Sequence, residues 1–260
     1  MSKQNISSAT ELFVGDLNDP VAVTANGKKG VPFTPFTQVS LGTPGVAVAD
    51  YLVKAATSTE LPNAATKTYT PATDNVSPLD GAAAAPSTIF MDGADRLVWV
   101  LDAPRALTGV MTHNSSVVAS TVTVSGYDQY MKPMSELMTF TATGTTKTVA
   151  GKKAFKYVSS IAITAAGDST TNTLNLGTNE VLGLPYKLAA KADFLHNGTY
   201  FGDVLEATAA TVVKADATSP ATTSTGDVRG TVDLNSTLDG SAISVIFIAD
   251  KTAPLGVAQV

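Results

Sequence analysis

Residues 121–163 read TVTVSGYDQYMKPMSELMTFTATGTTKTVAGKKAFKYVSSIAI, and this stretch decides the fold class. Apolar or β-branched residues alternate with polar ones in several runs, and segments rich in Gly, Thr and Lys separate the runs. Such alternation is typical of half-buried β-strands, because successive side chains point to opposite faces of a sheet. The stretch therefore predicts consecutive strands joined by turns.

Two details of this stretch lead to further predictions. Residues 134–140 put Met and Phe side chains on one face of a strand, and Glu136 shares that face as an exception to the alternation. Residues 147–153 read as a turn, because glycine and polar residues favour turns. We expect Lys152 and Lys153 of this turn to be solvated.

The same pattern extends over the rest of the chain. Further strands are expected at 96–101, 105–111, 117–125, 155–164, 174–176, 181–188 and 211–214, with hairpins at 193–206 around Asn197-Gly198 and at 228–249. Only residues 46–56 suggest a short helix. Strands that follow one another at spacings of about 8–14 residues without helices between them favour antiparallel sheets. The predicted fold is all-β: an antiparallel β-sandwich, Ig-like or jelly-roll-like, with an extended Pro/Gly-rich N-terminal arm.

Composition divides the chain near residue 88. Residues 1–88 hold short apolar pieces between many Pro and Gly residues, and proline interrupts strands because it lacks a backbone N–H. They are interpreted as an extended arm that orders against a partner, as a linker-like region, or as a small irregular β region. Residues 89–260 are predicted to form the β-sandwich body, and a sub-boundary near residues 190–215 is an open alternative.

The charge balance and the absence of cysteine exclude several classes of function. Charged residues make up 15% of the chain, and the formal net charge is -5. Binding to nucleic acid needs a basic patch or stripe, which the sequence lacks. Without cysteine there are no disulfides, thiol nucleophiles or Cys-ligated metals. No signal-peptide pattern is seen and no apolar run reaches about 20 residues, so we expect a soluble product that is made in a cytoplasm.

No set of residues in the sequence indicates catalysis. The two histidines, His113 and His196, each lie beside an asparagine and are interpreted as loop residues. Residues 92–95, DGAD, lack the alternating acidic ligands of a calcium loop and are interpreted as a turn. Residues 226–230, GDVRG, are too few for a phosphate-binding loop and indicate a strand entry with an exposed Arg229. We therefore predict no enzyme activity and assign no catalytic, cofactor-binding or metal-ligating residue.

Large apolar side chains in the predicted strands form the expected core of the body. They are Trp99, Phe140, Phe155, Ile161 and Phe247. Trp99 has an alternative role as an anchor of an interface, because Trp is enriched among the residues that dominate binding energy.

Several short motifs follow one another between residues 98 and 234. They are LDAPR at 101–105, VTVSGYD at 122–128, MSE at 134–136, GKKAF at 151–155 running into VSSI at 158–161, LGLPYK at 182–187 and GDVRGT at 226–231. In this order they resemble a pattern of virion structural proteins of tailed bacteriophages. The chain departs from that pattern at Met131-Lys132, where a glycine-containing turn is usual.

The resemblance implies a capsid decoration or cement protein without enzymatic activity. Such proteins lie on the outer surface of the virion capsid and bridge subunits of the major capsid protein. They are often homo-oligomers, and a trimer is the expected state, with no direct contact to nucleic acid or membrane. The alternative is a tail, fibre or baseplate component that recognises host-surface glycans, which would carry exposed aromatic side chains on the loops at one end of the body. A carbohydrate-active enzyme is disfavoured, because the sequence singles out no pair of carboxylates.

Overall fold

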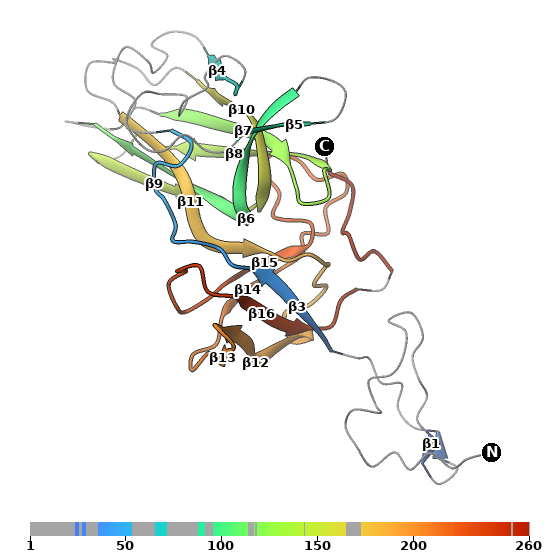
Figure 1. Cartoon of the computed structure of the whole chain (residues 1–260). Coiled ribbons are helices and arrows are strands. Elements are labelled where there is room, and N and C mark those ends of the chain that lie inside the picture. The colour runs from blue at the N-terminus through green and yellow to red at the C-terminus, as the bar shows by residue number, and fades with distance from the viewer. Residues whose placement is uncertain are drawn as a thin grey trace.

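The computed structural model describes most of the predicted body and parts of the N-terminal region. The described residues are 24–25, 28–29, 36–53, 66–71, 88–91, 96–113, 117, 119–142, 144–164, 173–250 and 252–259. Their regular structure is almost entirely β-strand, and the ladders between strands are antiparallel (Figure 1). The prediction of an all-β antiparallel fold is confirmed.

The larger sheet has ten strands and curls into a half-barrel (Figure 1). Its strands are β4 (Lys67–Tyr69), β5 (Thr88–Met91), β6 (Arg96–Thr112), β7 (Ser120–Tyr127), β8 (Pro133–Phe140), β9 (Thr146–Ala150), β10 (Phe155–Ile163), β11 (Thr173–Gly183), β14 (Thr211–Lys214) and β15 (Gly230–Asp233). The order through the sheet is β14-β15-β11-β6-β10-β7-β8, with β4 on β10 and with β5 and β9 on β6. β6 is long enough to pair with β5 and β10 along its first half and with β9 and β11 along its second half.

The smaller sheet lies below the half-barrel in the view of Figure 1. It has four strands, β3 (Thr37–Gly42), β12 (Phe194–Phe201), β13 (Val204–Leu205) and β16 (Ile243–Phe247), in the order β13-β12-β16-β3. A 3₁₀ turn, η3 (Lys191–Asp193), leads into β12. β1 (Thr24–Ala25) and β2 (Lys28–Lys29) pair only with each other.

Two apolar cores hold the sheets together. The first is enclosed by the half-barrel, and alternate residues of β7 and β8 point into it. β10 adds Phe155, Val158, Ile161 and Ile163, at a spacing that its register shifts change from strict alternation. The second lies where the smaller sheet meets the β11–β15 end of the larger one. All the predicted core residues are buried, with Trp99 1% exposed and Phe140, Phe155, Ile161 and Phe247 0% exposed. Each such burial stabilises the fold by about 1.5–3 kcal/mol, and Trp99 is a core residue rather than a surface anchor.

β6 is one strand where two were predicted, at 96–101 and 105–111. The expected corner at Asp102–Pro104 lies inside β6, where the ladder to β10 shifts register between Phe155 and Tyr157. Proline is tolerated there because an irregular ladder does not require its missing N–H.

The hairpin predicted around Asn197-Gly198 is wrong. Both residues lie within β12, and the chain reverses after Phe201 instead. The reversal is made by Gly202 and Asp203, whose φ angles are 56° and 63°. Two consecutive positive φ angles are the conformation of a tight hairpin turn, which Gly, Asn and Asp adopt most readily.

The hairpin predicted at 228–249 is also wrong, because its two strands belong to different sheets. β15 pairs with β11 and β14, whereas β16 pairs with β12 and β3. The alternation of apolar residues marks both strands correctly, but it does not specify which neighbour a strand takes.

Part of the predicted arm is built into the body. β3 completes the smaller sheet on β16, and Leu52 and Val53 are fully buried in the first core. The helix predicted at 46–56 is wrong for its described part, residues 46–53, which form bends and a single bridge from Val53 to Leu176. A deletion of residues 2–60 would therefore remove core residues, and a truncation that preserves the body ends before β3.

Candidate functional site

Buried charged side chains form a network where β7, β8, β10 and β15 begin or end. Its charged members are Asp128, Glu136, Lys153, Asp227 and Arg229, none of them more than 3% exposed. They belong to four motifs that lie far apart in the sequence, and hydrogen bonds connect these motifs in the fold. Because an unpaired buried charge is costly, the partners of each member decide what the network does.

Arg229 pairs with Asp128 at the centre of the network. Its Nη1 lies 2.6 Å from Oδ2 of Asp128, and its Nε donates to the carbonyl of Leu184 at 3.1 Å. The guanidinium carbon lies 5.4 Å from the ring centroid of Tyr130. The prediction of an exposed Arg229 is wrong, because its counter-ion comes from a turn 101 residues away that the local sequence does not reveal.

Asp128 also fixes the turn that follows β7. Its Oδ1 accepts the backbone N–H of Tyr130 at 2.8 Å and of Lys132 at 2.9 Å, and its Oδ2 accepts Nε2 of Gln259 at 2.9 Å. Met131, inside this turn, has a φ of 63°. Glycine adopts that conformation at the least cost, which accounts for the glycine that the resembled pattern places at this turn.

Asp227 links the residues just before β10 to the residues at the start of β15. Its Oδ1 accepts the N–H groups of Arg229 at 2.8 Å and Gly230 at 3.2 Å, and its Oδ2 accepts the N–H of Ala154 at 3.0 Å. Burial raises the pKa of Asp227, and Arg229 and these three N–H groups oppose that effect. The carboxylate therefore holds backbone in place.

Lys153 ties the same region to β8. Its Nζ donates to the carbonyls of Ser135 at 2.9 Å and Thr222 at 2.6 Å, and its burial lowers its pKa. The prediction that Lys153 is solvated is wrong, whereas its neighbour Lys152 is exposed as expected.

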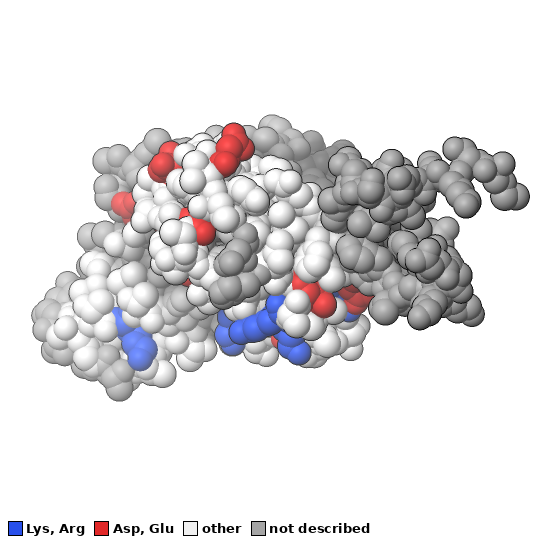
Figure 2. All heavy atoms as spheres, turned by 90° about the horizontal axis from the view of Figure 1, so that it is seen from below, with Lys and Arg blue, Asp and Glu red and all other residues white. Residues whose placement is uncertain are grey.

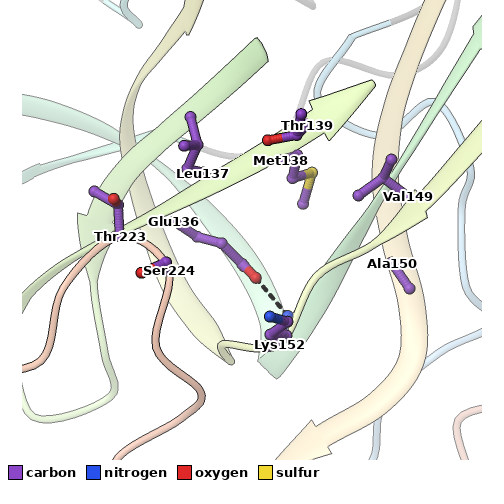
Figure 3. Close-up of a pocket in the computed structure, with 9 residues that line it drawn as sticks. All are labelled: Glu136, Leu137, Met138, Thr139, Val149, Ala150, Lys152, Thr223 and Ser224. Carbon is purple, nitrogen blue, oxygen red and sulfur yellow. Dashed lines mark hydrogen bonds between the residues drawn. The ribbon is translucent and has the colours of Figure 1, made fainter. Parts of the chain in front are cut away.

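Glu136, the exception in the alternation of β8, is explained by the turn after β9. Its Oε1 accepts the N–H of Lys152 at 2.5 Å (Figure 3), and its Oε2 accepts that of Lys153 at 3.4 Å. Burial raises the pKa of Glu136, and the two backbone N–H groups act against that rise. A carboxylate on the apolar face is thus the acceptor that this turn requires.

The carboxylate of Glu136 also lines a pocket of about 250 Å³ between β8 and β9 (Figure 3). The other walls are Leu137, Met138, Thr139, Val149, Ala150, Lys152, Thr223 and Ser224. Both oxygens of the carboxylate already accept backbone N–H groups, and no histidine lines the pocket. In this pocket the carboxylate therefore serves as the acceptor that holds the turn between β9 and β10.

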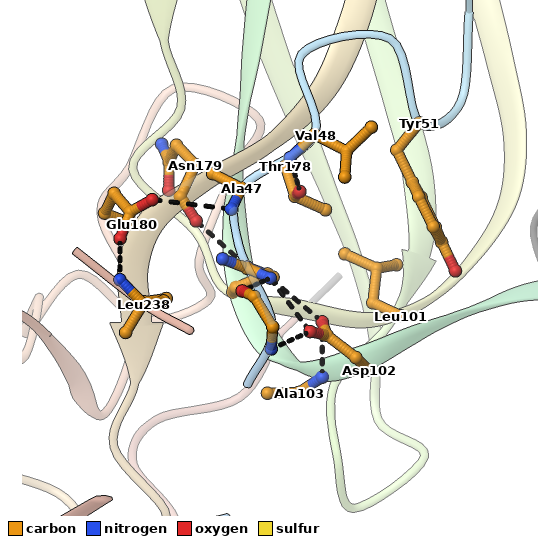
Figure 4. Close-up of polar contacts among 12 residues, drawn as sticks. Ala47, Val48, Tyr51, Leu101, Asp102, Ala103, Thr178, Asn179, Glu180 and Leu238 are labelled. Atoms are coloured by element: carbon orange, nitrogen blue, oxygen red, sulfur yellow. Dashed lines mark hydrogen bonds and ion pairs between the residues drawn. The ribbon is translucent and has the colours of Figure 1, made fainter. Parts of the chain in front are cut away.

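A second polar cluster fastens residues 43–49, here called the strap, which lead from β3 to the first core. The N–H of Gly45 donates to Oδ2 of Asp102 at 2.8 Å, and that of Val48 donates to Oγ1 of Thr178 at 2.9 Å (Figure 4). At Gly177 of β11, an added Cβ would lie 2.0 Å from the carbonyl oxygen of Val48. The strap thus lies directly against the sheet, and these side-chain bonds act together with two backbone bonds, from the N–H of Thr178 to the carbonyl of Val48 and from the N–H of Gly240 to the carbonyl of Pro44, both at 2.9 Å.

Arg105, 1% exposed, completes this cluster. Its Nη1 lies 3.0 Å from Oδ2 of Asp102 and donates to the carbonyl of Gly45 at 3.1 Å, and its Nε donates to the carbonyl of Asn179 at 2.9 Å. The ion pair of the LDAPR motif therefore holds the strap in place between the two sheets.

Exposed apolar side chains gather at two places on the surface. Tyr130, Met131 and Tyr186 are 37%, 43% and 38% exposed, and the hydroxyl of Tyr130 donates to the carbonyl of Pro185 at 2.8 Å. Val204 and Leu205 of β13, 68% and 47% exposed, lie together at the second place, and Leu195 of β12 and Val213 of β14 are exposed as well.

The remaining candidate residues do not converge. His113 follows β6, and His196 lies within β12, with its side chain outside the described residues. The predicted turn at 92–95 also lies outside them. In the described part of the chain no group of three or more His, Cys, Asp or Glu is placed to hold a metal ion. None of its helical segments has the length and hydropathy of a membrane span.

Comparison with known proteins adds no relative. No protein-family model, no curated protein and no solved structure matches the chain.

Proposed function

We propose that this chain is a non-enzymatic virion structural protein that binds the outside of a phage capsid and stabilises it by bridging capsid subunits. One observation carries the proposal. Six charged residues of the motifs that resemble the phage virion pattern are buried, and they hold strands, turns and the strap of the β body: Arg105, Asp128, Glu136, Lys153, Asp227 and Arg229.

A body of this kind suits a bridging role, since buried ion pairs and hydrogen bonds to the backbone hold its strands together in a chain that has no cysteine. Each described ionisable group in the network has a backbone or charged partner that fixes a turn or a strand end, which supports a structural role. The partners we propose are the major capsid protein and further copies of this chain, as a trimer on the capsid surface. This role also agrees with a surface of low charge that makes broad contacts.

Heating assembled shells tests the stabilisation. Shells of the major capsid protein are heated with increasing amounts of this protein and then separated on a sucrose gradient. We expect the temperature of disruption to rise and to level off at a fixed ratio of the two proteins. A disruption temperature that does not change at any ratio would refute the proposal.

A second candidate function, recognition of host-surface glycans by a tail or fibre component, is favoured by the exposed Tyr130 and Tyr186. Tyr130 is held by the buried Arg229 and by the carbonyl of Pro185, so its ring is fixed before a ligand binds. On an array of bacterial surface glycans, this function predicts binding that Tyr186→Ala abolishes and Val204→Ala retains. Native protein that binds no glycan on the array would exclude it.

A further inference from the structure

A groove runs beside β14, the strand at one end of the larger sheet. It has a volume of about 280 Å³ and is lined by Lys191 and Phe194 on one side and by Ala210, Thr211 and Val212 on the other. Phe194 and Val212 belong to the second core or pack against it, so the floor of the groove is apolar.

Among the described residues the outer edge of β14 has no strand ladder, and just past its end the N–H of Ala215 donates to the carbonyl of Leu188 at 2.9 Å. β14 pairs with β15 on its other side. Val213 in the middle of the strand is 52% exposed. An unpaired edge presents a row of N–H and C=O groups, and an extended segment can add to it as a further strand.

Basic side chains flank this edge. Lys191 and Lys214 are exposed at its two sides, and Figure 2 shows Lys and Arg side chains along one side of the face seen from below. Of the nearby carboxylates, that of Asp193 accepts the N–H of Ala190 at 3.2 Å, and that of Asp233 is half-buried, so that burial and the nearby Glu180 raise its pKa. Of these four charged side chains only the two lysines are exposed, whereas the carboxylates of Asp193 and Asp233 are half-buried.

The chain itself contains a segment of complementary chemistry. Residues 8–23, SATELFVGDLNDPVAV, carry the acidic residues Glu11, Asp16 and Asp19, no Lys or Arg, and the apolar run Leu12–Val14. The segment precedes β3, which begins at Thr37, and an extended chain spans about 3.3 Å per residue, so residues 8–23 can reach a neighbouring molecule.

We propose that residues 8–23 of one copy bind in the groove of a second copy, with Leu12–Val14 along β14 and the carboxylates beside Lys191 and Lys214. The inference rests on the proposed function, since it names the contact through which a bridging protein assembles with itself. The arm of one copy precedes β3, an edge strand of the smaller sheet, and we place its binding site at β14, at the end of the larger sheet of the second copy. A contact between two different surfaces is head-to-tail, and such contacts close into rings when the rotation between copies allows it.

Two variants with reversed charges provide the test. The arm variant is Glu11→Lys/Asp16→Lys, and the groove variant is Lys191→Glu/Lys214→Glu, both in the full chain. Sedimentation velocity is measured from about 1 to 100 µM, where native protein is expected to associate. Each variant alone should associate at least about tenfold more weakly, because reversal replaces attraction by repulsion at two pairs.

An equimolar mixture of the two variants distinguishes exchange between copies from binding within one chain. In the mixture an arm meets a groove of opposite charge whenever the two variants are neighbours, so association should rise well above that of either variant alone. In a ring of three copies one contact between like variants remains, so we expect recovery that is large but incomplete. Lys147→Glu on β9 is the matched control and should associate like the native protein. The fluorescence of the buried Trp99 reports whether each variant is folded.

Three results would overturn the inference: a native protein that stays monomeric, variants that associate like the native protein, or a mixture in which association does not rise above that of either variant alone. No shells are present in these measurements. A monomer that still protects shells would therefore remove this inference and leave the proposed function standing.

Discussion

The buried pair of Arg229 and Asp128 gives the sharpest quantitative prediction. The perturbation is Asp128→Asn, which keeps the shape of the side chain and an oxygen that can accept the N–H groups of Tyr130 and Lys132. What it removes is the negative charge 2.6 Å from Nη1 of Arg229. The change also replaces the Oδ2 acceptor of Arg229 and Gln259 by an amide donor, so the variant measures the loss of the ion pair together with its hydrogen bonds.

The expected loss of stability is large, because both side chains are almost completely buried, with 1% of Arg229 and 0% of Asp128 exposed. Removing one partner of a buried ion pair costs about 3–5 kcal/mol. For a protein of this size, that loss lowers the midpoint of thermal unfolding by about 6–20 °C. The double substitution Asp128→Asn/Arg229→Met should recover most of the loss, since it leaves no unpaired charge.

Urea unfolding followed by the fluorescence of Trp99 measures these differences. Trp99 is the only Trp and is 1% exposed in the first core, so its emission reports the packing of the half-barrel. The four proteins of the cycle are the native chain, Asp128→Asn, Arg229→Met and the double variant. The stability losses of the two single variants, added together, should exceed the loss of the double variant by at least about 2 kcal/mol.

Two results would refute this reasoning. One is a loss below about 1 kcal/mol for Asp128→Asn, which is the range of exposed ion pairs. The other is a double variant whose loss equals the sum of the single losses, because additivity means that the two residues do not interact.

Three further changes test other parts of the fold. Gly177→Ala should lower the free energy of unfolding by about 2–3 kcal/mol, because the added Cβ would lie 2.0 Å from a carbonyl oxygen of the strap. Gly42→Ala is the control, with a φ of +86° but open space around it, and should cost about 1 kcal/mol. Equal losses of stability in thermal unfolding would contradict the placement of the strap. Met131→Gly should raise stability by up to about 1 kcal/mol by relieving the positive φ, and a destabilised variant would argue against strain there. The hydrogen bond from Lys187 holds the pKa of Asp250 well below its usual range. The stability that the ionised Asp250 contributes is therefore present above the usual pKa of an aspartate and is lost as the pH falls, so the native protein should lose more stability than Asp250→Asn between about pH 5 and pH 2. Profiles of stability against pH that run parallel for the two proteins would contradict the pairing.

The elements of the body are predictable from local patterns, since burial on one face imposes a period of two on the sequence. β7 and β8 show it directly, and Phe140, Phe155 and Ile161 are buried where the alternation places them. The pairing of the strands is not predictable in the same way. β15 and β16 are neighbours in sequence yet join different sheets, because each packs into the second core beside strands that are distant along the chain.

The polar network was predictable only at Glu136, where a carboxylate interrupts an apolar face. Lys153 and Arg229 have the local pattern of surface residues, because their partners lie far away in the sequence, 69 residues for Thr222 and 101 for Asp128. The Pro- and Gly-rich composition of the first 88 residues likewise gave no prediction of the strand β3 or of the burial of Leu52. Short elements that depend on tertiary contacts carry little local pattern.

Size-exclusion chromatography with light scattering, on the protein alone and mixed with assembled shells of the major capsid protein, tests the central claim most directly. The account predicts that the protein elutes with the shells at a fixed stoichiometry, and that a shell-bound fraction remains when free protein is removed. Protein that elutes at its own volume at every shell concentration would contradict a role on the capsid.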